Sequence, residues 1–82
     1  MLSNAMRDPH NEYPQQYRIR VQGSLDSAWS GRLCGLHMLT EHFPNRPPET
    51  VLSGELPDQA ALHGVLSSLY TLGYRLLSVE TS

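Results

Sequence analysis

The sequence predicts a small α+β domain with the element order β-β-β-α-β, in which one helix packs on one face of a small, mostly antiparallel sheet. Two patterns predict this class. Apolar and polar side chains alternate over residues 17–22, as on a strand with one buried and one solvent-exposed face. Apolar residues then recur at intervals of three and four over residues 58–73, as on a helix that buries one stripe, and another apolar segment follows at residues 74–80.

Length and composition allow one domain. The chain has 82 residues, of which 39% are hydrophobic and 17% are charged. Apolar residues are sparse in residues 1–16, where we expect a flexible arm, and denser in residues 17–82, where we expect a single α+β domain. Residues 1–5 end in a Ser-Asn-Ala sequence that matches a scar of tag removal, so they take no part in the functional argument.

The first expected strand has apolar side chains at every second position: Tyr17, Ile19 and Val21. We expect these side chains to face the core, because successive side chains of a strand point to opposite faces of the sheet. Arg18 and Arg20 then lie together on the opposite, solvent-exposed face.

The second expected strand spans residues 31–41, and both of its faces carry apolar side chains. One face would hold Cys34, Leu36 and Met38. The other would hold Leu33, His37 and Leu39. A short helix is the alternative, and we favour the strand because two glycines in five residues weaken a helix. Residues 42–49 contain three prolines and predict a turn or loop. Residues 50–56 predict a short third strand at a sheet edge or beside one, so that the first three strands form an antiparallel meander.

The expected helix has recognisable ends. Asp58 is placed to cap its N-terminus, where a carboxylate accepts hydrogen bonds from free backbone N–H groups. The buried stripe contains Leu62, Val65, Leu66, Leu69 and Leu72. Gly73 follows the stripe as a helix-ending glycine. In the fourth strand we expect Leu77 and Val79 to face inward, and we expect this strand to run parallel to the third if both share a sheet.

One helix covers only one face of a sheet. The other face is expected to carry Arg18 and Arg20 together with the apolar Leu33 and Leu39. A partly apolar face, or an edge strand beside it, requires a partner that covers it. We therefore expect a homo-oligomer, in the first instance a homodimer.

The charge balance argues against nucleic-acid binding. Six basic and eight acidic residues give a net charge of −2, whereas a nucleic-acid-binding domain typically has a pI above about 9. No apolar run approaches the ~20 residues of a membrane span, so we expect no membrane partner. A single cysteine, Cys34, allows no intramolecular disulfide, which favours a reducing, cytoplasmic location.

The spacing of soft ligands argues against a metal site. Cys34, His37 and His42 are the candidates, but on a strand residues 34 and 37 point to opposite faces, and residues 34 and 42 lie ~26 Å apart. Structural zinc normally takes four ligands from short paired spacings. We expect no metal, no cofactor, and a core position for Cys34.

Five residues are candidates for binding. His63 lies near the expected helix N-terminus, beside the Asp58 cap, and a scaffold or surface role is favoured because no nucleophile or carboxylate stands at a catalytic spacing from it. Arg18 and Arg20, roughly 6.6 Å apart along a strand, suit a carboxylate or phosphate, although alternate arginines more often mark a solvated face. Trp29, in a turn-like segment, either anchors a partner or covers the end of the core as a lid, and we favour the lid.

Two segments resemble a small, uncharacterised family of bacterial proteins. The shared pattern runs near Y-x-I-R-V-x-G-x-L-D-x-x-W, then D-Q-A-A-L-H-G-V-L, then L-G-x-x-L-L-S-V, and covers Tyr17 to Val79. The resemblance implies no activity, but it places Asp58, His63 and Trp29 in family-defining motifs. The segment ALHGVLSSLYTLGYRLLSVE is also distantly similar to ACT-type regulatory domains, whose amino-acid ligand usually sits at a dimer interface, although the preceding strands do not follow the ACT order.

Three functional hypotheses follow. The leading one is a non-enzymatic interaction or regulatory module assembled through its sheet face or edge, because the apolar surplus exceeds what one helix covers and no catalytic set is recognised. The second is a small-molecule sensor with a ligand near the helix N-terminus, contacted by Asp58, His63 and the arginines of the first strand. The third is a small enzyme with a site between subunits and His63 as base.

Overall fold

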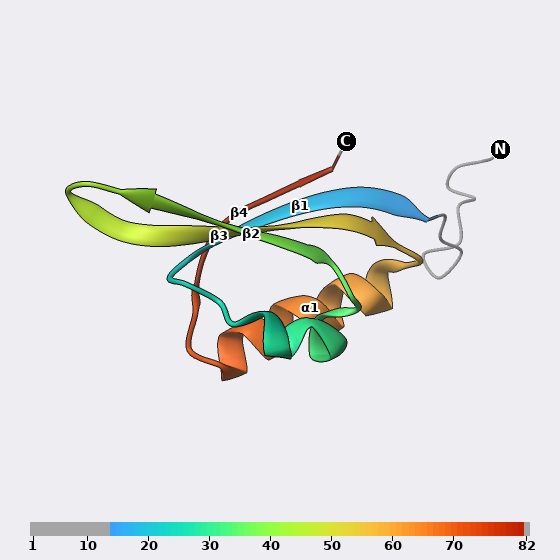
Figure 1. The fold of residues 1–82 in the computed structure, drawn as a ribbon. Coiled ribbons are helices and arrows are strands. Elements are labelled where there is room, and N and C mark those ends of the chain that lie inside the picture. Colours follow the sequence, from blue (N-terminus) through green and yellow to red (C-terminus); the bar gives the residue numbers. More distant parts are fainter. Residues whose placement is uncertain (1–13, 82) are drawn as a thin grey trace, which may run out of the picture.

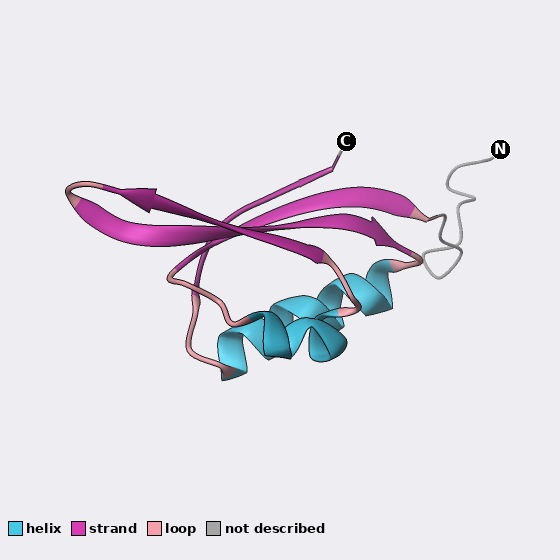
Figure 2. Ribbon diagram, in the orientation of Figure 1, coloured by secondary structure: helices cyan, strands magenta, loops and turns pink. Residues whose placement is uncertain are grey.

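The computed structural model describes residues 14–81, and this range folds into one four-stranded sheet, one α-helix and one 3-10 helix (Figures 1 and 2). The elements in chain order are β1 (Gln15–Gln22), the 3-10 helix η1 (Ser27–Leu33), β2 (His37–Phe43), β3 (Arg46–Leu56), α1 (Gln59–Thr71) and β4 (Arg75–Thr81). This order confirms the predicted α+β class. Most of the predicted N-terminal arm lies outside the described residues, but Gln15 and Gln16 belong to β1.

The strands are arranged in the order β2-β3-β1-β4, and each neighbouring pair is antiparallel. The predicted meander of the first three strands is wrong, because β1 pairs with β3 and β4 and not with β2. The connection through η1 is long enough to carry the chain past the position that β3 later takes. β3 and β4 are both antiparallel to β1 and therefore point in the same direction, as predicted, with β1 between them.

α1 and η1 lie together against one face of the sheet, the covered face, while the described residues place no helix on the opposite, open face (Figure 2). The core between the layers consists of Tyr17, Ile19, Val21, Leu25, Leu33, Leu36, Leu52, Leu56, Leu62, Val65 and Leu69. The predicted alternation of β1 is confirmed by its three core residues. Burying an aliphatic side chain of this size stabilises the fold by about 1.5–3 kcal/mol.

η1 and the turn after it replace the first half of the strand predicted at residues 31–41. Asp26 caps η1, with its Oδ1 accepting a hydrogen bond from the Ala28 backbone N–H at 2.9 Å. This local cap favours a helical turn over an extended chain. Leu33 is buried within η1, so its predicted place on the open face is wrong. Cys34 follows with a left-handed backbone (φ 59°) and is exposed, so its predicted core position is also wrong.

β2 and β3 form a long hairpin whose turn projects beyond the helical layer (Figure 1). The predicted loop at residues 42–49 is wrong, because only Pro44 and Asn45 separate the two strands. Pro47 and Pro48 belong to β3, opposite the shift in the β2–β3 register. Proline is tolerated at such an irregularity because it has no N–H to give to the ladder.

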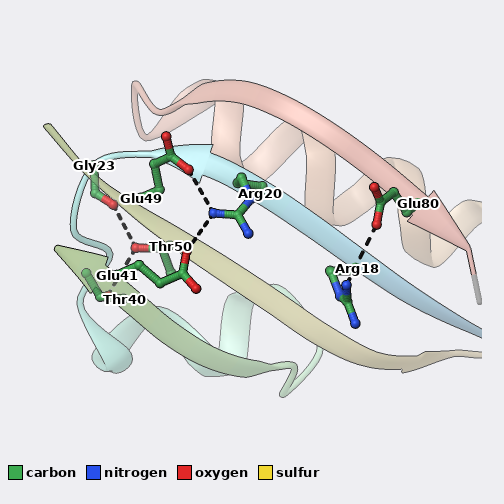
Figure 3. A network of polar contacts seen from close by, with 8 residues as sticks. All are labelled: Arg18, Arg20, Gly23, Thr40, Glu41, Glu49, Thr50 and Glu80. Carbon is green, nitrogen blue, oxygen red and sulfur yellow. Dashed lines mark hydrogen bonds and ion pairs between the residues drawn. The ribbon is translucent and has the colours of Figure 1, made fainter. Parts of the chain in front are cut away.

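β3 contains 11 residues and is the second strand of the sheet. It is longer than predicted, and it lies beside an edge strand, which is one of the two predicted positions. Its Thr50 is fully buried, where an unpaired hydroxyl would be costly. The Thr50 hydroxyl donates to the Gly23 carbonyl at 2.7 Å and lies 3.2 Å from the Thr40 hydroxyl (Figure 3). It also accepts from the Leu25 N–H at 3.0 Å. These contacts hold the connection after β1 against the β2–β3 hairpin.

α1 begins and ends where its sequence predicts. The Asp58 carboxylate accepts from the Ala61 N–H at 2.8 Å and caps the helix. At the other end Gly73 has a φ of +89°, a conformation that costs a glycine little. Its N–H donates to the Tyr70 carbonyl, and the next N–H donates to the Leu69 carbonyl, both at 3.0 Å. This pair of bonds is the Schellman motif, which satisfies carbonyls that the helix leaves free.

Candidate interaction surface

β4 forms one edge of the sheet and carries exposed apolar side chains. Leu76, Leu77 and Val79 are 47%, 40% and 38% exposed. Val79 lies opposite Ile19 and Leu76 lies opposite Val21, so both occupy the covered face. Val79 therefore lies on the predicted face, but it is not buried, because β4 has a strand neighbour on one side only within the described chain. Leu77 is exposed as well, and it lies at a register shift between the residues paired with Arg20 and Val21.

A groove of about 430 Å³ lies between the C-terminal half of α1 and the start of β4. It is lined by Leu66, Leu69, Tyr70, Gly73, Tyr74, Arg75 and Leu76. Tyr70 is 84% exposed on its rim. Because Leu76 belongs both to the groove and to the edge strand, the two features are continuous. We call the exposed apolar residues Tyr70, Leu76, Leu77 and Val79 the β4 surface.

The position of the groove wall is fixed by the chain behind it. The Tyr74 hydroxyl donates to the Ser24 carbonyl at 3.2 Å. The ring of Tyr74 lies so close to Gly23 that a Cβ there would be 3.1 Å from it, and Gly23 has a φ of +117°. Any larger residue at position 23 would push the Tyr74 ring and strain the backbone. The turn after β1 thus positions an aromatic wall of the groove.

The charged residues of β4 lie on the open face. Arg75 lies opposite Gln22, and Glu80 lies opposite Arg18 in the β1–β4 register. The guanidinium of Arg18 is 3.9 Å from the Glu80 carboxylate, with both side chains largely exposed (Figure 3). An exposed ion pair of this length contributes little to stability.

Arg20 is held by two carboxylates of the hairpin. Its Nη1 donates to Glu41 Oε1 at 2.7 Å and to Glu49 Oε1 at 2.8 Å (Figure 3). The hydrogen bond to Glu41, followed by that to Glu49, raises the pKa of Arg20 above its ordinary value. Glu41 and Glu49 face each other directly across β2 and β3, an arrangement that repels without a cation between them. Arg20 therefore links three strands.

The predicted ligand residues lie on two different sides of the molecule. Arg18 and Arg20 are on the open face of the sheet, whereas Asp58 caps α1 and His63 lies exposed on α1, beyond the covered face. The sheet separates the two pairs, so the structure does not bring them together in one cluster. Their roles in ligand binding remain predictions.

Trp29 lies in η1 and is partly buried against the core. The guanidinium carbon of Arg32 is 5.4 Å from the centre of its ring. Trp29 therefore covers the core, in the position of the predicted lid. Its predicted contact with a partner remains a prediction.

Tyr70, Arg75 and Leu76 are not among the residues that the sequence predicts for a site. One signal points to Leu76: the last strand carries apolar residues at consecutive positions, 76 and 77, which no single buried face accommodates. The neighbours of that strand, which decide its exposure, are set by the whole fold.

Residues 14–81 contain neither a membrane-spanning helix nor a cluster of metal ligands. No helix in this range is long and apolar enough to cross a membrane. In the same range, no three His, Cys, Asp or Glu side chains are grouped so as to hold a metal ion.

Residues 16–80 match the model of a family described as a domain of unknown function (DUF8691), and the chain belongs to this family. The match spans almost all of the described fold, which agrees with the expectation of an uncharacterised family. The comparison with curated proteins and the comparison with solved structures each return no match.

Proposed function

We propose that this DUF8691 protein is a non-enzymatic interaction or regulatory module that works as a homo-oligomer, with the β4 surface as its contact region. The observation that carries the proposal is the edge of β4, which is unpaired within residues 14–81 and whose apolar side chains continue into the groove beside α1. Association would remove these side chains from water, and this is the main driving force of most protein assembly.

The edge of β4 has one feature that helps to keep edge strands apart, a shift in its register with β1 at Leu77. Such strands are also protected by lysine, by proline or by charges that point inward. β4 has neither lysine nor proline, and three large aliphatic side chains stand between the charged residues near its ends. An edge of this kind favours pairing with another strand.

The open face has less need of a partner. Its central cation, Arg20, is already bound by Glu41 and Glu49. Leu39 is a large apolar side chain on that face, 57% exposed, and single exposed leucines are common on protein surfaces. The contrast favours β4 over the open face as the region of contact.

The surroundings of His63 favour a non-enzymatic role. Within the described part of the chain, its imidazole makes no hydrogen bond and no ion pair. A catalytic base is normally oriented by a hydrogen bond to a third group. His63→Ala is therefore expected to leave assembly unchanged.

The test is the mass of the full chain in solution, measured by multi-angle light scattering over a hundredfold range of concentration. We expect a dimer that dissociates on dilution. Two matched variants locate the contact, because both exchange an exposed leucine of an edge strand for glutamate. Leu77→Glu in β4 should weaken the dimer by roughly thirtyfold or more, the scale of an interface hot spot. Leu39→Glu in β2 should leave it intact.

Two outcomes contradict the proposal. A monomer at every concentration excludes the homo-oligomer. If Leu39→Glu disrupts the dimer and Leu77→Glu does not, the contact lies at the β2 edge and not at β4. Circular dichroism of both variants checks that each is folded.

A further inference from the structure

We infer that two copies of the chain join β4 to β4 in an antiparallel pair, in a register that places Arg75 opposite Glu80 of the second copy and Leu76 opposite its Val79. The two four-stranded sheets then form one continuous sheet. This inference rests on the proposed function and specifies the geometry of the contact.

Symmetry limits the possible registers. A pair of identical strands in a closed dimer is related by a two-fold axis, so the contact is the same on both copies. In the inferred register the axis passes between Leu77 and Ser78. In a regular antiparallel pair the axis would fall on a residue, because successive side chains alternate between faces. The register shift at Leu77 breaks this alternation in β4, so that residues five apart share a face. Each charged pair and each apolar pair therefore occurs twice.

The faces of the β4 side chains agree with this register. Side chains directly opposite each other in an antiparallel pair lie on the same face. Arg75 and Glu80 both lie on the open face, as their partners in β1 show. Leu76 and Val79 both lie on the covered face. Arg75 therefore meets the oppositely charged Glu80, and Leu76 meets the apolar Val79, while Leu77 lies opposite Ser78 at the axis.

The neighbouring registers fail this comparison. With the axis on Ser78, Leu76 lies opposite Glu80, which is on the other face. With the axis on Leu77, Arg75 lies opposite Val79, again across faces. Both registers leave the charges unpaired and set a charged side chain against an apolar one. Of the three registers, only the inferred one sets Arg75 against Glu80 and also keeps these opposed side chains on the same face.

The groove beside α1 lies next to the inferred contact. A continuous sheet keeps the covered faces of both copies on one side, so the two α1 helices stand on the same side of the joined β4 strands. Val79 of the second copy then lies beside Leu76, at the margin of the groove. The groove is completed by a residue of the second copy, and the exposed Tyr70 ring lies near that margin.

Charge reversal tests the register. Arg75→Glu replaces two attractive pairs by two repulsive ones and should raise the dimer Kd roughly tenfold, measured by sedimentation equilibrium at low salt. Combining it with Glu80→Arg reverses both charges and should restore the Kd to within about threefold of wild type. Arg46→Glu, which makes the same change in charge at the hairpin, is the control and should leave the Kd unchanged.

The wild-type dimer provides a test that needs no variant. In a dimer mixed from isotope-labelled and unlabelled chains, NMR should detect an intermolecular contact between the methyl groups of Leu76 and Val79. A stable dimer without this contact, or without rescue in the double variant, overturns the register and leaves the proposed function standing. A wild-type chain that is monomeric at every concentration overturns both.

Discussion

The two edges of the sheet differ in how their exposed side chains are satisfied. At the β2 edge, Glu41 is bound by Arg20 from β1, and Thr40 reaches the buried hydroxyl of Thr50. At the β4 edge, apolar side chains are exposed beside a groove, and Glu80 makes a long ion pair with Arg18. One edge uses its side chains to hold the fold together. The other leaves apolar side chains exposed, and we propose that a second chain covers them.

This difference predicts two separate classes of variant. Changes on the β2 side should alter the free energy of unfolding of the single chain and leave association unchanged. Changes on the outer side of β4 should alter association and leave the unfolding of the single chain nearly unchanged. If variants at either edge altered the free energy of unfolding and the association equally, the two edges would not differ in role.

Thr50→Val is expected to have the largest effect on folding. It keeps the shape of the side chain but leaves the Leu25 N–H and the Gly23 carbonyl without their partner in a buried place. An unsatisfied buried group costs about 1–3 kcal/mol, so the free energy of unfolding should fall by that amount. Urea denaturation at low protein concentration measures it. An unchanged midpoint would show that the hydroxyl contacts do not hold the connection after β1.

Asp58→Ala is expected to have the next largest effect. Removal of the cap frees the Ala61 N–H and should lower the free energy of unfolding by about 1 kcal/mol. Asp58→Asn keeps an acceptor and should recover most of the loss. Thermal unfolding followed by circular dichroism compares the two. Equal losses in both variants would mean that the carboxylate charge, and not the hydrogen bond, is what stabilises α1.

Arg20→Gln is expected to have a smaller effect on the same side of the sheet. It leaves the opposed Glu41 and Glu49 without the cation between them, so the Tm should fall. Added salt screens the repulsion between these carboxylates, so the variant should regain part of its Tm in salt. A Tm that does not change in the variant would show that the bridge between the three strands adds nothing to stability.

The parts of the fold that the sequence predicts correctly depend on local patterns. The alternation at Tyr17, Ile19 and Val21 sets the covered face of β1, and the cap at Asp58 with the glycine at 73 sets the ends of α1. Each of these signals involves residues that are close along the chain.

The parts of the fold that differ from the prediction depend on caps, backbone conformations and strand neighbours that the spacing of apolar residues does not reveal. The apolar pattern around Leu33 and Cys34 is compatible with a strand or a helix. The helix η1 forms because Asp26 caps its start and the left-handed backbone at Cys34 ends it. The prolines of residues 44–48 suggested a loop, yet the turn takes only one of them and a register shift accommodates the others. The exposure of Val79 follows from strand order, which local spacing does not reveal.

The most direct test of the contrast between the edges is hydrogen exchange at both, measured by NMR at low and at high protein concentration. If β4 pairs with β4, the outward amides of Arg75–Thr81 gain protection as concentration rises, while the outward amides of His37–Phe43 do not change. Protection that rises at β2, or at neither edge, would contradict the account.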